Sequence, residues 1–241
     1  LEASSKEKEE ESRKAAPIRV TTEGNKVIVR AIRKHDSFGT QLWNLFGQHS
    51  TEARYTIRVP ANFSADLDTS GGDISTSGLT GSMKADTSGG DLTFENIHGE
   101  ITADTSGGGI KLSGCDGHAH LDTSGGHIEV TDGRGNLTAD TSGGNITVLN
   151  LAGNAKVESS GGKLRLANIS GKLNAETSGG SISAILPAKA PEDIPLQTSA
   201  GPINLLTPPK ASLPTGPRTD PGQPHRRPPA PRTSRAQQQH P

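Results

Sequence analysis

The chain has 241 residues and a formal net charge of −1, from 25 basic and 26 acidic side chains. Only 29% of the residues are apolar and 2% are aromatic, which is too little bulk to fill the core of an ordinary globular domain of this length. These values exclude a large multidomain enzyme, argue against a sandwich or Rossmann domain, and carry no nucleic-acid-binding signature. No apolar run approaches the ~20 residues of a membrane span.

The N-terminal part of the chain differs in composition from the remainder. Residues 1–16 mix Glu with Lys and Arg, which is typical of a charged linker, a truncated segment or a solvated helix end. Residues 17–67 are predicted to form an N-terminal β cap and the first rung of the fold. Segments 18–20 and 27–31 alternate around Glu23-Gly24-Asn25, which predicts a hairpin. Four of the six aromatic residues lie between 38 and 55, where we expect a plug for the first rung or, alternatively, a patch that contacts a ligand or lipid.

Residues 68–206 contain a repeat with a fixed period of 18 residues. The string Asp-Thr-Ser-Gly-Gly or a close variant begins seven times without an insertion, and a degenerate eighth copy, Thr198-Ser199-Ala200-Gly201, comes after a three-residue slip. The first positions of the seven copies are Asp68, Asp86, Asp104, Asp122, Asp140, Glu158 and Glu176. A period kept this strictly predicts a structural unit of fixed perimeter.

Numbered from its Asp or Glu, each repeat contains two short stretches in which apolar and polar residues alternate. Positions 7 and 9 are mostly apolar around a polar position 8, and positions 16 and 18 flank a polar position 17. Period two predicts two short strands per repeat, with positions 7, 9, 16 and 18 facing inward. Position 12 is mostly apolar and carries the single cysteine, Cys115, which we expect to be a small buried hydrophobe.

Glycines recur between these strands. Gly71-Gly72, Gly89-Gly90 and their equivalents precede the first strand of each repeat, where we expect a tight corner with positive φ. A further glycine occupies position 14.

The fold predicted from this pattern is an all-β, single-stranded β-solenoid (β-helix) with 18-residue coils and about seven to eight rungs. One repeat is too small to fold alone, because ordering its backbone costs more than burying its few inward side chains contributes. Stacked repeats share a continuous interior. The pattern disfavours the left-handed hexapeptide helix, which requires an aliphatic residue every six positions, but it does not specify the handedness.

Residues 207–241 hold ten prolines, and six Lys or Arg against one Asp give them a net charge of +5. This composition predicts a disordered, basic Pro-rich tail. A plain linker is the simpler interpretation; the alternative is contact with an anionic wall polymer, nucleic acid or lipid headgroups.

The first position of each repeat stacks carboxylates when the coils stack. At a spacing of ~4.8 Å, neighbouring charges repel by ~0.9 kcal/mol in water. We expect each carboxylate to lie at a solvated corner and to accept hydrogen bonds from following backbone N–H or hydroxyl groups. A ladder of bound cations is the alternative, although one carboxylate per coil supplies few ligands.

Other rows offer weaker candidates for a site. The threonines that follow these carboxylates form one row, whereas the ice-binding solenoids use a face two columns wide. His118 and His120, with His127 on the next turn, are expected to be scattered surface histidines rather than a metal site. No nucleophile, phosphate-loop or dinucleotide motif is present. We therefore predict no catalytic residue, no metal and no cofactor, and we expect that the protein is not an enzyme.

The repeated Asp-Thr-Ser-Gly-Gly-x-Ile with a later Gly-x-apolar-x-Ala, preceded by Tyr55-Thr56-Ile57-Arg58-Val59-Pro60-Ala61, resembles the bacterial adhesin-like family of β-strand-repeat proteins. The resemblance covers about residues 17–206. It implies a non-enzymatic, extracytoplasmic protein of the cell envelope or a secreted one. The sequence begins at Leu1, so a signal peptide or anchor before this residue would not be visible.

Taken together, these observations predict a structural or adhesin-like module that presents a regular polar surface, mainly at positions 8, 15 and 17. The expected partners are cell-surface or wall polymers or another envelope protein. The alternative is an envelope-stress or regulatory scaffold that binds a protein partner through Trp43 and Phe46 in the N-terminal cap.

Overall fold

The computed structural model describes residues 18–23, 26–31, 55–188 and 194–207, and every regular element in these ranges is a β-strand. The chain divides into two units, Leu1–Val59 and Pro60–Pro241. In the first unit, β1 (Ile18–Glu23) pairs with β2 (Lys26–Ala31) in an antiparallel arrangement, with Glu23 opposite Lys26. The predicted hairpin is therefore present. The aromatic residues Phe38, Trp43 and Phe46, predicted to belong to the cap, lie outside the described residues.

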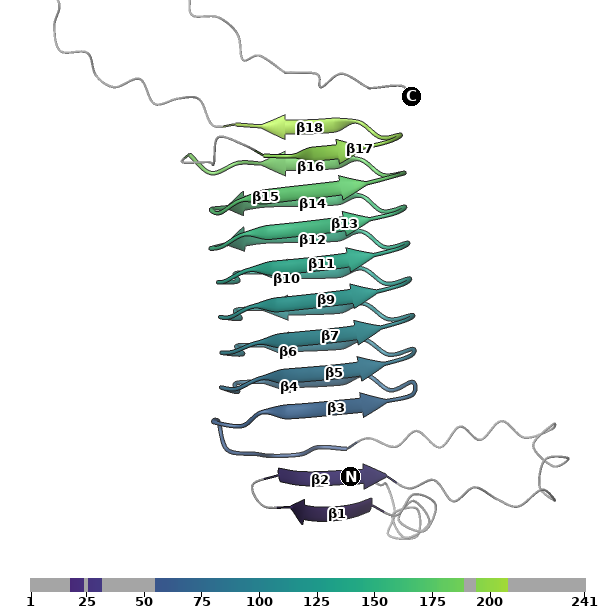
Figure 1. The fold of residues 1–241 in the computed structure, drawn as a ribbon, viewed down its shortest axis with the longest axis vertical. Coiled ribbons are helices and arrows are strands. Elements are labelled where there is room, and N and C mark those ends of the chain that lie inside the picture. Colours follow the sequence, from purple (N-terminus) through teal and green to yellow (C-terminus); the bar gives the residue numbers. More distant parts are fainter. Residues whose placement is uncertain (1–17, 24–25, 32–54, 189–193, 208–241) are drawn as a thin grey trace, which may run out of the picture. The chain divides into compact units, whose positions relative to one another are not determined.

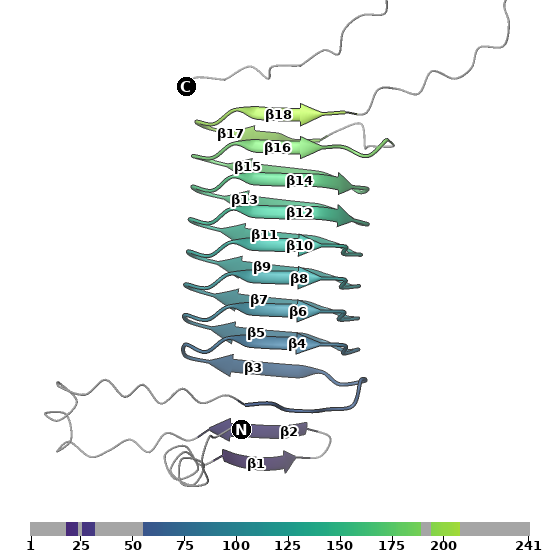
Figure 2. The same cartoon turned by 180° about the vertical axis from the view of Figure 1, so that it is seen from behind.

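The second unit is a β-solenoid built from two parallel eight-stranded sheets (Figures 1 and 2). The odd-strand sheet consists of β3 (Ala65–Thr69), β5 (Met83–Thr87), β7 (Ile101–Thr105), β9 (Ala119–Thr123), β11 (Leu137–Thr141), β13 (Ala155–Ser159), β15 (Leu173–Thr177) and β17 (Leu196–Thr198). The even-strand sheet consists of β4 (Ile74–Ser77), β6 (Leu92–Glu95), β8 (Ile110–Ser113), β10 (Ile128–Thr131), β12 (Ile146–Leu151), β14 (Leu164–Ile169), β16 (Ile182–Ile185) and β18 (Ile203–Leu206).

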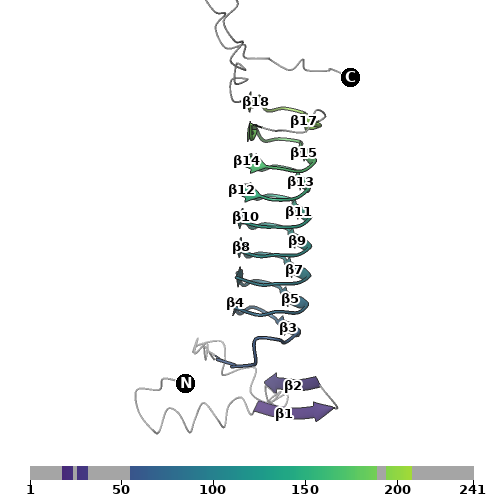
Figure 3. The same cartoon turned by 90° about the vertical axis from the view of Figure 1, so that its left-hand side faces the viewer.

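Each coil contributes one strand to each sheet, and consecutive coils stack in register. Residues 18 apart in the sequence are paired neighbours, as in the pairing of Leu121 with Ala103 and with Ala139. Edge-on, the sheets form two facing stacks (Figure 3). In Figure 1 the odd strands in front run to the right and the even strands behind run to the left as the chain rises, so the coil is right-handed; Figure 2 shows the same from behind. Connections between parallel strands favour this hand. Eight strands per sheet at ~4.8 Å give a stack about 34 Å high. The predicted solenoid and its 18-residue coil are confirmed.

The interior consists of stacked rows, each built from one position of the repeat. The register places Ile128 between Ile110 and Ile146, so like side chains contact like along the stack. Inward side chains of the middle coils are buried and alternate with exposed or half-buried neighbours, and Phe94 is the largest fully buried side chain. In the first coil Leu67 is only half-buried. Burial of each row therefore depends on the coils on both sides, as a repeat fold requires.

A row of hydroxyl side chains continues the inward alternation of the odd-strand sheet. Thr123 at position 2 is 1% exposed, and its Oγ1 donates to the carbonyl oxygen of Gly108 at 2.9 Å in the preceding coil. The same oxygen accepts the N–H of Gly126 at 3.1 Å in its own coil. The other buried members of the row are Thr87, Thr105, Thr141, Ser159 and Thr177. Each makes both bonds, so the row satisfies the buried backbone groups of the glycine corner.

The Gly-Gly pairs lie in bends, as predicted, but the expected reason for them is wrong. Gly71, Gly72, Gly89 and Gly90 do not have the positive φ that we expected. The second glycine of a pair is instead required by close stacking of coils, because a Cβ on Gly90 would lie 2.1 Å from the carbonyl oxygen of Gly72. A Cβ on Gly89 meets nothing nearer than 3.8 Å, so the first glycine has no such restriction.

Positive φ occurs at two other positions of the coil. At position 11 of the first six repeats the chain has left-handed backbone, and there this position carries only glycine, asparagine or aspartate, the residues that tolerate it best. These residues are Gly78, Asn96, Gly114, Asp132, Asn150 and Asn168, with φ between 53° and 66°. The glycine at position 14 also has positive φ in four coils, from 104° at Gly135 to 148° at Gly81.

The last coil keeps the register despite its longer loop. Thr198 pairs with Thr177, 21 residues earlier, and its hydroxyl bonds Gly180 and Gly201 as the other members of the row do. Pro195 and Pro202 precede β17 and β18, and their carbonyls accept bonds from the coil below. Proline has no N–H to donate, so these residues weaken the edge for further strand pairing.

Candidate functional site

The outward side chains form columns on two opposite faces of the solenoid. Positions 17 and 1 lie on the outer face of the odd-strand sheet, which is toward the viewer in Figure 1. Positions 8 and 10 lie on the outer face of the even-strand sheet, toward the viewer in Figure 2. Position 15 precedes each odd strand at the corner. The positions predicted to form one polar surface are thus divided between two faces.

The carboxylates of position 1 form one continuous column. The strand register pairs Asp68, Asp86, Asp104, Asp122, Asp140, Glu158 and Glu176 in sequence. Each lies one residue before the end of its strand rather than in the corner, which corrects our expectation. The corner N–H groups bond to the threonine row instead, because position 2 points inward at the glycine pair while position 1 points outward.

Lysines at position 17 neutralise two members of this column. Lys84 Nζ lies 2.5 Å from Asp86 Oδ2, and Lys156 Nζ lies 2.7 Å from Glu158 Oε1. Hydrogen bonding and charge attraction to these carboxylates raise the pKa of both lysines. Between the two pairs, Asp104 has a raised pKa because of partial burial and then because of the charges of Asp86 and Asp122.

Asp140 has a raised pKa for the same two reasons: burial, followed by the charge of Glu158. Neighbouring carboxylates stacked along parallel strands repel one another, and the structure accommodates this by keeping the column at the surface. The outer face of the odd-strand sheet therefore carries a row of neighbouring negative charges.

The histidines singled out from the sequence lie at the surface, His120 in β9 and the other two in the corners between strands. His118 Nδ1 accepts the backbone N–H of Asn136 at 3.4 Å, and His127 Nδ1 accepts that of Asn145 at 2.9 Å. Glu100, His118 and His120 border a shallow surface hollow of about 190 Å³. Within the described residues, no group of three or more His, Cys, Asp or Glu side chains is arranged to hold a metal ion.

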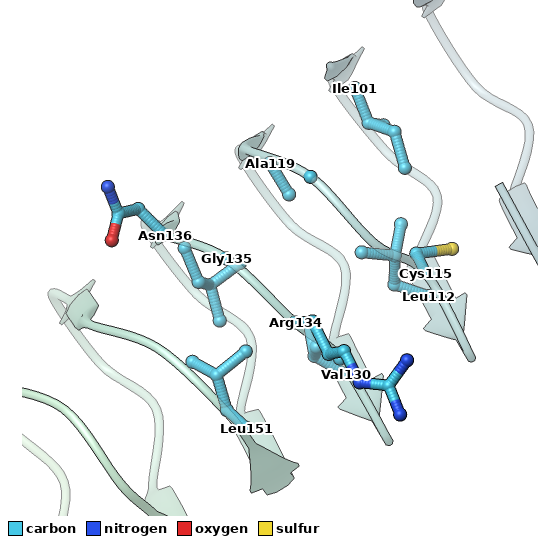
Figure 4. Close-up of a pocket in the computed structure, with 12 residues that line it drawn as sticks. Ile101, Leu112, Cys115, Ala119, Val130, Arg134, Gly135, Asn136 and Leu151 are labelled. Atoms are coloured by element: carbon cyan, nitrogen blue, oxygen red, sulfur yellow. The ribbon is translucent and has the colours of Figure 1, made fainter. Parts of the chain in front are cut away.

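A small internal cavity lies beside Cys115, at the corner between the sheets (Figure 4). Its volume is about 10 Å³, the size of a single water, and Ile101, Leu112 and Leu151 help to line it. Cys115 is buried, as predicted, and burial raises the pKa of its thiol. The cavity arises where position 12 carries Cys115 and Gly133 in consecutive coils instead of leucine or isoleucine, so packing rather than ligand binding accounts for it.

Two predicted site residues, Trp43 and Phe46, lie outside the described residues, and their role as a partner patch stays a prediction. The described part of the chain contains no helix long and apolar enough to cross a membrane.

Sequence reasoning missed the residues that join one coil to the next. The threonine row is the main one, although positions 16, 18 and 2 alternate and so place it on the inner side. At position 11, Asn150 Nδ2 donates to Asp132 Oδ1 at 2.9 Å, and Asn168 Nδ2 donates to Asn150 Oδ1 at 3.0 Å. At position 6, Asp91 Oδ1 accepts the N–H of Gly109 at 2.6 Å. The recurrence of Gly, Asn and Asp at position 11 was the sequence feature from which the left-handed backbone at this position could have been predicted.

Comparison with family sequence models is consistent with this architecture. The model of the Toastrack DUF4097 family matches residues 3–215 of the chain. The chain belongs to the Toastrack DUF4097 family. A Toastrack domain is a β-solenoid-like structural domain of unknown function, so membership supports the β-repeat fold and supplies no catalytic activity; an adhesive role does not follow from it. Searches of curated proteins and of solved structures found no match.

Proposed function

We propose that this Toastrack protein is a non-enzymatic, extracytoplasmic structural module whose outer columns bind a repeating polymer or a partner protein. The observation that carries the proposal is the register of the two sheets. Outward side chains recur at the spacing of one strand, ~4.8 Å, over the seven coils from β3 to β16 without an insertion. Such a surface favours a ligand with its own repeat, because each unit adds a weak contact and the contacts sum.

The geometry favours surface binding over chemistry in a pocket. The internal cavity beside Cys115 holds at most one water, and the hollow at His118 is open to solvent. Enzyme sites usually enclose their ligands in a cleft with a few converging polar groups. A rigid rod with a continuous polar surface is better suited to adhesion or scaffolding.

The test compares variants on the two faces. His120→Ala and Thr138→Ala remove side chains from position 17 on the odd-strand sheet, and Lys111→Ala and Glu129→Ala remove side chains from position 8 on the even-strand sheet. We expect the wild type to be retained by isolated cell-wall polymer or by particular sugars on a glycan array. One pair of substitutions is expected to weaken that retention while the other, its matched control, leaves it unchanged.

Far-ultraviolet circular dichroism of each variant checks that the solenoid is intact. Retention no higher than background on both cell-wall material and the array would argue strongly against polymer binding. An equal loss in both pairs would show that neither face is the specific surface.

A further inference from the structure

The two outer faces of the solenoid differ sharply in charge. On the odd-strand sheet, positions 17 and 1 carry eight carboxylates and two lysines, which gives a net charge of −6. The eighth carboxylate is Asp66, at position 17 of the first coil. On the even-strand sheet, positions 8 and 10 carry Lys111, Arg165, Glu95 and Glu129, whose charges cancel. The rod therefore has one acidic face and one electrically balanced face.

Most carboxylates of the acidic face form no ion pair with another described residue, although His120 lies on the same face. Only Asp86 and Glu158 of the column form ion pairs there, with Lys84 and Lys156. Asp104, Asp122 and Asp140 occupy three consecutive coils between these pairs. Burial, and then the charges of neighbouring carboxylates, raise the pKa values of Asp104 and Asp140. A cation laid along this stretch gains attraction from several carboxylates at once.

The chain itself contains a segment of complementary charge. Residues 208–241 carry one acidic residue, Asp220, and six basic residues, so their net charge is +5. The basic residues are Lys210, Arg218, Arg226, Arg227, Arg232 and Arg235. Five of the six are arginines, whose planar guanidinium groups form paired hydrogen bonds with carboxylates.

The length and starting point of this segment permit it to reach the acidic face. It follows Thr207, directly after β18 at the C-terminal end of the stack. Passing from the even-strand sheet to the outer face of the odd-strand sheet requires roughly 10 Å, the distance between packed sheets. The column from Asp68 to Glu176 spans six coil spacings, about 29 Å. An extended segment of 34 residues covers about 105 Å, so length is not limiting.

We propose that the segment 208–241 binds across the outer face of the odd-strand sheet, with its arginines against Asp104, Asp122 and Asp140. Ten prolines lie in residues 207–241, and proline cannot donate to a strand ladder. The segment therefore binds through its side chains to the face of the sheet and does not extend an edge. Covalent connection keeps the segment at a high effective concentration, so weak pairs suffice. The basic segment covers the acidic face and competes with any other cation for it.

Zero-length cross-linking of the full chain tests this proposal. A carbodiimide joins a lysine amine to a carboxylate only when the two are in contact, and Lys210 together with an Arg226→Lys substitution places two amines in the segment. We expect peptide mapping by mass spectrometry to find links to Asp104, Asp122 or Asp140. Glu95 and Glu129 on the opposite face are the internal control and are expected to form no link to the amines of the segment, although Glu129 is within reach of Lys111, 3.9 Å away on the same face.

Two perturbations separate charge pairing from chance contact. Salt at about 0.5 M shortens the screening length to a few ångströms and is expected to abolish the links. Arg218→Glu with Arg227→Glu is expected to reduce them, while a neutral change in the same segment, Gln223→Ala, leaves them unchanged. Links distributed equally over both faces, or no links from the segment, would overturn the proposal. Links found only between isotopically light and heavy copies in a mixture would overturn it too, because the occupant is then a second molecule.

Discussion

The threonine row provides the sharpest test of how successive coils are held together. Thr123→Val keeps the shape of the side chain and removes its hydroxyl, which bonds Gly108 O at 2.9 Å and Gly126 N at 3.1 Å in a site that is 1% exposed. A neutral hydrogen bond contributes ~0.5–1.5 kcal/mol, and a buried polar group left without a partner costs ~1–3 kcal/mol. Because valine leaves one donor and one acceptor without this partner, at ~1–3 kcal/mol each, we expect a loss of ~2–6 kcal/mol.

Thr123→Ser is the matched control, because it keeps the hydroxyl and removes only a methyl group. The chain already uses serine in this row: Ser159 bonds Gly144 O at 3.0 Å and Gly162 N at 2.9 Å. Removing one buried methyl group costs ~0.5–1.5 kcal/mol, so serine is expected to be less harmful than valine.

The measurement is urea unfolding followed by circular dichroism, with midpoints compared between variants, because repeat proteins can depart from two-state behaviour. Hydrogen exchange of the Gly126 amide gives a local readout, and we expect it to accelerate in the valine variant only. A valine variant as stable as the serine variant, with a protected Gly126 amide, would refute the role assigned to the hydroxyl.

Two further predictions concern the glycine corner and the acidic column. Gly108→Ala places a Cβ 1.9 Å from Gly90 O and is expected to cost at least ~1–3 kcal/mol by forcing two coils apart, whereas Gly107→Ala, whose nearest neighbour is at 3.6 Å, is expected to be neutral or slightly stabilising in the same unfolding assay. Similar unfolding midpoints for these two variants would contradict the stacking argument. The pKa values of Asp104 and Asp140 in the folded protein lie above those in the unfolded chain. The protonated carboxyls therefore favour the folded state; this stabilisation is complete below the unfolded pKa of ~3.9 and is lost as the pH rises through the folded pKa values. Asp104→Asn is therefore expected to raise the unfolding midpoint at pH 7 and to have little effect near pH 4; a lower midpoint at pH 7 would show that the aspartate is stabilised where it lies.

The sequence predicted the coil well because the solenoid depends on features that are local and periodic. Alternation of side chains places Ile128 and Val130 inside and Glu129 outside without knowledge of any distant contact. The fixed period then determines which coils are neighbours. Even the slip before Thr198 was visible, since the degenerate motif still marked the position at which the register resumes.

The features that the sequence did not reveal depend on contacts between coils. Aspartate and threonine are both common in turns, so composition alone favoured Asp122 as the residue that bonds the corner. The structure assigns that role to Thr123, because only the inward side chain reaches a carbonyl oxygen 15 residues earlier. The glycine pair was similarly ambiguous: positive φ and close backbone stacking both require glycine, and only coordinates distinguish them at Gly90.

The candidate surface was predictable as a set of outward positions but not as a pattern of charge on opposite faces. Positions 8 and 17 are both polar, and neither position by itself indicates that the sheets face opposite directions across one thin core. The ion pair between Lys156 and Glu158, by contrast, was predictable from alternation, because positions 17 and 1 lie two residues apart on the same side of a strand.

Because no insertion interrupts the coils between β3 and β16, the number of coils sets the length of the solenoid, whereas the outward side chains set the properties of its surface. Deleting or duplicating one coil removes or adds a single layer of ~4.8 Å and leaves every remaining layer facing the same way. The number of copies therefore sets the length of the solenoid alone, and the side chains of each coil can change without altering the stacking of the others.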